Sequence, residues 1–124
     1  RQMVRDLDFQ VRIHVCPIVR EADGLALSSR NRFLAPDERE QATVLNRALL
    51  AAAETARRER DPAATARVLA ETVRTAPLAR IDYAVVVHPD TLQPVEDFSD
   101  GAALALAVFF GSTRLIDNLI LAKI

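Results

Sequence analysis

The fold is decided by residues 103–121, which read ALALAVFF, then GS, then TRLIDNLIL. Residues 103–110 are apolar on both faces of an extended chain, which is typical of a strand in the middle of a sheet. Gly111-Ser112 is a two-residue hairpin signal, so residues 113–121 should return as an antiparallel neighbour. We therefore predict a central strand joined to a second strand by a tight turn.

A third strand is predicted upstream, because the hydrophobic period is two over residues 81–88. One face would carry Ile81, Tyr83, Val85 and Val87, and the other Asp82, Ala84, Val86 and His88. A loop from Pro89 to Gly101 separates this strand from the central one. Together the three segments predict a three-stranded antiparallel sheet.

Two helices are predicted between Pro36 and Pro77. Pro36 suits the first position of a helix, and the first apolar stripe comprises Val44, Leu45, Ala48, Leu49 and Ala52. Asp61 is a good N-cap with Pro62 behind it, so a second helix should start directly after the first. Its stripe comprises Ala66, Leu69, Ala70 and Val73. The expected fold class is α+β, a helical hairpin packed on the three-stranded sheet.

The N-terminal residues predict a short helix and a separate strand. Met3, Val4 and Leu7 share one helical face over residues 1–7. Phe9, Val11, Ile13 and Val15 then alternate with polar residues up to Pro17, which favours a strand over residues 9–16.

Composition excludes several classes of protein. Half of the residues are hydrophobic and 27% are charged, as in a globular domain, and the net charge of -1 offers no basic stripe for nucleic acid. Cys16 is the only cysteine, so neither an intrachain disulfide nor a Cys-x-x-Cys site is possible. The longest apolar run, residues 102–110, is far shorter than the ~20 residues of a membrane helix. We expect a cytoplasmic location, with no membrane and no nucleic acid as partner.

Chemistry is most strongly suggested by the connection between Ile18 and Ala35, which has no regular period. Within it, Ser28, Ser29 and Arg30 offer two hydroxyl donors and a forked cation, a set that suits a phosphate. Gly24 could let the connection hinge over a ligand. The alternative is that the serines form local turns and Arg30 is a solvated charge, and spacing alone favours that alternative.

A family resemblance points the other way. Residues 17–34, PIVREADGLALSSRNRFL, resemble the segment that carries the KMSKS-like loop in the pantoate:beta-alanine ligase family, the pantothenate synthetases. Two further segments are similar to the same family in the same order, Ile81-Asp82-Tyr83 running to Pro89-Asp90-Thr91-Leu92, and Thr113-Arg-Leu-Ile-Asp-Asn118. The resemblance spans essentially the whole chain.

This resemblance implies an ATP-dependent ligase. Pantoate would attack the α-phosphate of ATP to give pantoyl adenylate and pyrophosphate, and beta-alanine would then displace AMP to form pantothenate. Ser28, Ser29 and Arg30 would contact the ATP phosphates as catalytic residues, and the backbones of Val19 and Leu27 would lie against the adenine. Mg²⁺ would arrive with the nucleotide, no resident metal is expected, and the family implies a homodimer.

The resemblance also implies that part of the enzyme is absent. The family's His-x-Gly-His motif and its Lys-Asp-Tyr-Gln-Gln-like stretch do not occur here. We therefore expect residues 1–18 to be a helix-strand remnant of a Rossmann-like N-terminal nucleotide-binding domain. Residues 19–124 would form the C-terminal domain, with the KMSKS-like loop at about 19–35, and this fragment alone would be inactive. Ala35 stands where the family often has an N-cap serine, a change expected to fray the helix start by about 1 kcal/mol.

A second hypothesis is a non-catalytic interaction or oligomerisation module, supported by the open edge that a strand at residues 9–16 would present. Other polar residues have plain structural interpretations. With no third ligand nearby, His14 and His88 are expected to be structural rather than metal-binding or catalytic. Asp117 is expected to satisfy local backbone donors or to face solvent.

Overall fold

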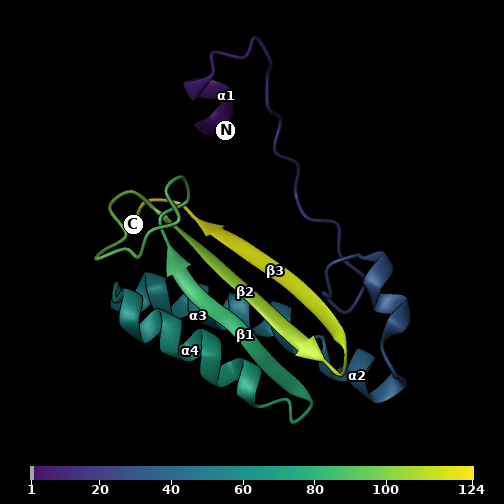
Figure 1. The fold of residues 1–124 in the computed structure, drawn as a ribbon. Helices are drawn as coiled ribbons and strands as arrows, with labels where there is room; N and C mark the ends of the chain where they lie inside the picture. The colour runs from purple at the N-terminus through teal and green to yellow at the C-terminus, as the bar shows by residue number, and fades with distance from the viewer. Residues whose placement is uncertain (1) are drawn as a thin grey trace.

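A computed structural model of the chain describes residues 2–124 and has two layers (Figure 1). One layer is an antiparallel sheet in the order β1-β2-β3, formed by Ala79–Val87, Ala102–Phe110 and Thr113–Leu121. The other consists of α3 (Val44–Glu59) and α4 (Pro62–Arg74), which both cover the same face of the sheet. The predicted helical hairpin on a three-stranded sheet is therefore confirmed.

The hairpin of residues 103–121 forms as its sequence predicts. β2 and β3 pair without interruption from Ala102 opposite Leu121 to Phe110 opposite Thr113. Gly111 in the turn has a φ of 55°, a conformation that glycine adopts without strain. The register between β1 and β2 shifts once, between Ile81 and Tyr83.

The first predicted helix is two helices, because α2 (Pro36–Gln41) ends before α3 begins. At the junction the Thr43 hydroxyl donates to the Glu40 carbonyl at 2.8 Å, a local bond that competes with the helical ladder. The loss of helix stability expected from the missing N-cap side chain at Ala35 is offset in part, because Glu38 Oε2 accepts a hydrogen bond from the Ala35 N–H at 2.9 Å. Asp61 caps α4 as predicted, with Oδ1 accepting from the N–H groups of Ala63 and Ala64 at 2.8 and 3.2 Å.

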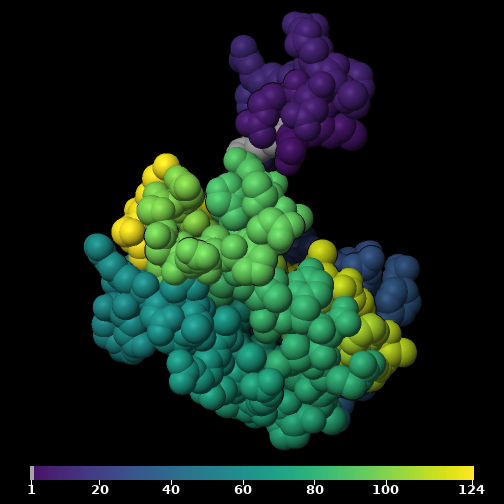
Figure 2. All heavy atoms as spheres, turned by 60° about the vertical axis from the view of Figure 1, so that its left-hand side comes forward, coloured from purple at the N-terminus to yellow at the C-terminus, as the bar shows by residue number. Residues whose placement is uncertain are grey.

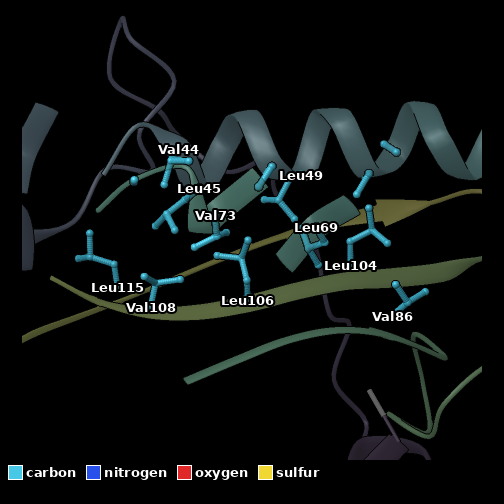
Figure 3. Packing of buried hydrophobic residues seen from close by; sticks show 14 of the residues in the cluster. Val44, Leu45, Leu49, Leu69, Val73, Val86, Leu104, Leu106, Val108 and Leu115 are labelled. Atoms are coloured by element: carbon cyan, nitrogen blue, oxygen red, sulfur yellow. The ribbon is translucent and has the colours of Figure 1, made fainter. Parts of the chain in front are cut away.

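The core lies between the helices and the sheet. Figure 3 shows Val44, Leu45 and Leu49 of α3 facing β2, where every second side chain is fully buried. The β2 residues on this face are Ala102, Leu104, Leu106, Val108 and Phe110. Leu69 and Val73 of α4 belong to the same cluster. The two hydrophobic periods, 3.6 and 2, thus meet in one close-packed layer.

The N-terminal segment departs from the prediction. Residues Gln2–Asp6 form the expected short helix α1, but the predicted strand at Phe9–Cys16 is absent. Alternation makes a strand only when a neighbour supplies the other half of the hydrogen-bond ladder, and none of the described strands is paired with these residues. The segment is exposed, and the N-terminal residues, α1 included, lie apart from α3 and α4 (purple in Figure 2).

Within residues 2–124, no helix has the length and apolar character needed to cross a lipid bilayer.

Candidate functional site

The connection predicted to be irregular contains a small, ordered hairpin, residues 19–27 (hereafter the hairpin), followed by a helical turn. Arg20 pairs with Ala26 in an antiparallel bridge, flanked by hydrogen bonds from Leu27 N to Val19 O at 2.9 Å and from Glu21 N to Leu25 O at 2.8 Å. Gly24 turns the chain with a φ of 90°. The backbones of Val19 and Leu27, the two residues expected beside adenine, therefore lie next to each other.

This hairpin is fixed to the domain by the burial of Leu25 and by a close contact between Gly24 and α3. Leu25 is only 2% exposed and belongs to the hydrophobic core. Gly24 lies against the side chain of Asn46 on α3, and a Cβ at this position would have to displace the Asn46 amide. A hinge at Gly24 would have to break these contacts, so the structure does not favour a loop that swings freely.

An ion pair fixes the hairpin to α2. Arg39 Nη1 lies 2.7 Å from Asp23 Oδ2, while Asp23 Oδ1 accepts from the Leu25 N–H at 3.2 Å. The hydrogen bond from Arg39, followed by that from Leu25, lowers the pKa of Asp23 below its ordinary value. The same pair raises the pKa of Arg39.

A second ion pair, which the sequence analysis missed, fixes the hairpin to β3. Arg20 Nη1 and Nη2 lie 2.6 and 3.0 Å from the two carboxylate oxygens of Asp117, and Nη1 also donates to the Gly24 carbonyl at 3.0 Å. The Asp117 side chain is 1% exposed. It does accept from the backbone N–H of Asn118 at 2.8 Å, as expected, but the expectation that it could face solvent is wrong.

The predicted phosphate-binding residues follow the hairpin at the start of a 3-10 helix, η1 (Ser29–Phe33). Ser28 Oγ accepts from the Arg30 N–H at 3.2 Å and so caps this helix, which is the local turn foreseen by the structural alternative. Ser28, Ser29 and Arg30 are all exposed. Arg30 forms no ion pair with any residue from 2 to 124, so its charge is available to an anion.

Arg30 lies between two hollows in the surface. A cavity of about 190 Å³ is lined by Leu25, Ala26, Leu27, Ser28, Arg30, Asn31, Leu45, Leu115 and Ile116. A wider and more open depression of about 630 Å³ is lined by Arg30, Phe33, Ser112, Thr113 and Arg114. Arg114 Nη2 lies 2.8 Å from Asp82 Oδ2, so the charge of Arg114 is already paired. Arg30 lines both hollows and has no such partner among residues 2–124. The arrangement suits a ligand that has an anionic part beside a part that contacts apolar side chains.

The other polar candidates lie elsewhere. His88 Nδ1 accepts from the backbone N–H groups of Asp90 and Thr91 at 3.1 and 3.2 Å, a structural role that agrees with the prediction. His14 is exposed on the N-terminal segment. Among residues 2–124 no three His, Cys, Asp or Glu side chains gather at one place.

Comparison with known proteins identifies relatives over nearly the whole chain. The family model for pantoate-beta-alanine ligase matches residues 1–120. A pantothenate synthetase of Acidobacterium capsulatum is 53% identical over 99% of this chain, and one of Anaeromyxobacter dehalogenans is 56% identical over 95% of it. The crystal structure of the pantothenate synthetase of Thermus thermophilus superposes with a TM-score of 0.88 at 49% identity, covering 95% of this chain.

These relatives are much longer than this chain. It spans 42% of the Acidobacterium protein, 41% of the Anaeromyxobacter protein and 43% of the Thermus chain. A pantoate-beta-alanine ligase of Francisella tularensis, solved in complex with Beta-gamma ATP and Beta-alanine, aligns with a TM-score of 0.60 at 27% identity, covering 96% of this chain and 37% of its own.

Proposed function

The chain belongs to the pantoate-beta-alanine ligase family, and on that premise we propose that it supplies the C-terminal part of an ATP-dependent ligase that makes pantothenate. The pantoate carboxylate attacks the α-phosphate of ATP, the bond to the β-phosphate oxygen breaks, and pyrophosphate leaves. The amine of beta-alanine then attacks the acyl carbon of pantoyl adenylate and displaces AMP. The Francisella ligase, solved with an ATP compound and beta-alanine, supports these two substrates.

The observation that carries the proposal is the exposed, uncompensated guanidinium of Arg30 beside two exposed serines. Negative charge builds up on the leaving pyrophosphate, and fixed cationic and hydroxyl donors stabilise it. Ser28 Oγ accepts from a backbone N–H, which leaves its own proton to donate to a phosphate oxygen. Ser28, Ser29 and Arg30 thus act on the triphosphate, and Mg²⁺ enters with the nucleotide.

The cavity next to Arg30 is where we place the nucleoside. Its walls include Leu25, Leu27 and Ile116, and the Leu27 N–H donates to the Val19 carbonyl, so one of the two expected backbones lines the cavity and the other is its direct neighbour. Residues 19–124 form the C-terminal domain that carries this half of the site, and residues 1–18 are a remnant of the N-terminal nucleotide-binding domain. That second domain supplies the pantoate site, the enzyme works in the cytoplasm as a homodimer, and residues 1–124 alone are inactive.

A direct assay tests this function. The complete protein that contains this chain, supplied with ATP-Mg, pantoate and beta-alanine, should release AMP, pyrophosphate and pantothenate in equal amounts. Arg30→Ala should slow adenylate formation by about a hundredfold, since one charge-stabilising donor is lost. Arg32→Ala is the matched control, because Arg32 lies in the same helix but stacks on the Phe33 ring at 4.8 Å. An Arg30 variant as fast as this control would remove Arg30 from its role.

The alternative of a non-catalytic module loses its support. It depended on an open strand at Phe9–Cys16, and the structure has no strand there.

A further inference from the structure

We propose that Arg20 and Asp117 form a clamp that positions the Ser28-Arg30 segment for the adenylation step. The proposal rests on the function proposed above and adds two positioning residues to it. Neither side chain is assigned to touch a substrate. They act through the backbone of the hairpin. They should therefore affect adenylation, in which the triphosphate reacts, and not the later attack of beta-alanine on pantoyl adenylate.

One guanidinium ties two distant segments together. Arg20 Nη1 lies 2.6 Å from Asp117 Oδ2, and Arg20 Nη2 lies 3.0 Å from Asp117 Oδ1, although the two residues are 97 positions apart. Nη1 also donates to the Gly24 carbonyl at the tip of the hairpin, at 3.0 Å. The carboxylate itself is held on β3 by the N–H of Asn118 at 2.8 Å. The fork therefore fixes the orientation of the hairpin as well as its distance from the sheet.

A short series of bonds leads from the clamp to the proposed phosphate-binding residues. Arg20 is paired directly with Ala26 across the hairpin. The Ala26 carbonyl accepts from Asn31 Nδ2 at 3.1 Å, which ties the hairpin to η1. Between Ala26 and Asn31 lie only Leu27, Ser28, Ser29 and Arg30. A shift of the Arg20 side chain would thus be passed to both ends of this short segment.

The clamp and the proposed nucleoside cavity also share a strand. Leu115 and Ile116, the two residues before Asp117 on β3, line the cavity of about 190 Å³ together with Ser28 and Arg30. Asp117 therefore anchors the hairpin to the same strand that forms one side of this cavity, next to the Ser28-Arg30 segment that the clamp positions.

Stability alone is a weak reason for a buried ion pair. Removing the carboxylate of Asp117 from water has a large cost, and apolar residues of similar size often stabilise a fold equally well. An Arg-carboxylate fork does supply a fixed geometry, which a single ammonium cannot reproduce. Positioning explains why this pair is charged and why its cation is forked.

The test separates the two half-reactions in the complete protein. Asp117→Asn and Arg20→Lys are compared with Asp100→Asn, which removes a carboxylate that pairs at the surface with Lys123 at 3.0 Å. Single-turnover pyrophosphate release reports adenylation, and capture of preformed pantoyl adenylate by beta-alanine reports the second step. We expect both clamp variants to slow adenylation between about ten and a hundredfold and to raise the KM for ATP. The second step, from which pyrophosphate is absent, should stay within about twofold of wild type, as should both steps in the control.

The outcomes are distinguishable. A wild-type protein that forms no adenylate would overturn the proposed function itself. A working wild type with folded clamp variants that adenylate at the normal rate would overturn the clamp alone. Equal loss of both half-reactions, in proportion to the folded fraction seen by circular dichroism, would assign the pair to stability and also overturn the clamp. If Asp117→Asn does not fold, Arg20→Lys decides alone, since it leaves a cation beside the carboxylate, and failure of both to fold counts against positioning.

Discussion

Two leucines two positions apart in the hairpin have opposite surroundings. Leu25 is 2% exposed and lies in the core, whereas Leu27 is 60% exposed at the rim of the cavity. Leu25→Ala should lower the free energy of unfolding by about 2 to 5 kcal/mol, because a buried side chain is replaced by a cavity. Leu27→Ala should change it by less than about 0.5 kcal/mol. Urea denaturation of both variants measures the difference, and equal effects would show that the hairpin is not docked as described.

The Asp23-Arg39 pair predicts a pH dependence with a definite sign. The pKa of Asp23 is lowered on folding from its ordinary value of 3.8, so its contribution to stability is present above that value and lost as the pH falls through the folded pKa. The difference in unfolding free energy between wild type and Asp23→Asn should stay constant between about pH 7 and pH 5 and shrink below about pH 4. A difference that grows on acidification would contradict this assignment.

For single residues, the sequence indicates which class of ligand a side chain suits better than it indicates which other residue the side chain contacts. Ser28, Ser29 and Arg30 could be chosen because hydroxyls and a guanidinium suit a phosphate. The partner of Arg20 could not be identified, since Asp117 lies 97 positions away. One signal was available: Asp117 is a charged residue at a position that the period of two aligns with Leu115 and Leu121 on the buried face of its strand.

Among the elements, α4 offers a clean test of capping. Asp61 Oδ1 accepts from two N–H groups in the first turn, so Asp61→Ala should destabilise the protein by about 1 kcal/mol. Glu71→Ala, at an exposed position inside the same helix, is the control and should have little effect. Thermal unfolding of the two variants measures both. If they melt together, the carboxylate does not cap the helix.

Elements with a clear period could be predicted, and elements that depend on distant contacts could not. The hairpin of residues 102–121 and the helix beginning at Pro62 follow from apolar spacing and turn residues. The strand predicted at Phe9–Cys16 fails because alternation does not supply a neighbouring strand. The small hairpin of residues 19–27 was missed because its stabilising contacts are with α2, α3 and β3.

In the whole molecule, all of the buried residues described lie at or after Leu25. From Gln2 to Val19 no residue is buried. A truncated chain of residues 19–124 should therefore melt within about 2 °C of the chain of 124 residues, because no core contact is lost. Circular dichroism at equal concentration checks this. A marked fall in melting temperature would show that the N-terminal segment stabilises the rest of the chain.

At the scale of the whole molecule, the segment that carries Ser28, Ser29 and Arg30 is part of the same body as the helices and the sheet. Contacts with three elements hold the hairpin, so Ser28, Ser29 and Arg30 should move together with the helices and the sheet rather than as a free loop. Sequence alone suggested a flexible connection, because its length and the glycine at position 24 are visible while its anchors are not.

The central claim is that Ser28, Ser29 and Arg30 hold the triphosphate. A crystal structure of the complete protein with pantoate and a non-hydrolysable ATP analogue tests it most directly. We predict the Arg30 guanidinium and the two serine hydroxyls within about 3.2 Å of phosphate oxygens, with the base in the cavity beside Leu27. A nucleotide bound elsewhere, with these three side chains still facing solvent, would contradict the account.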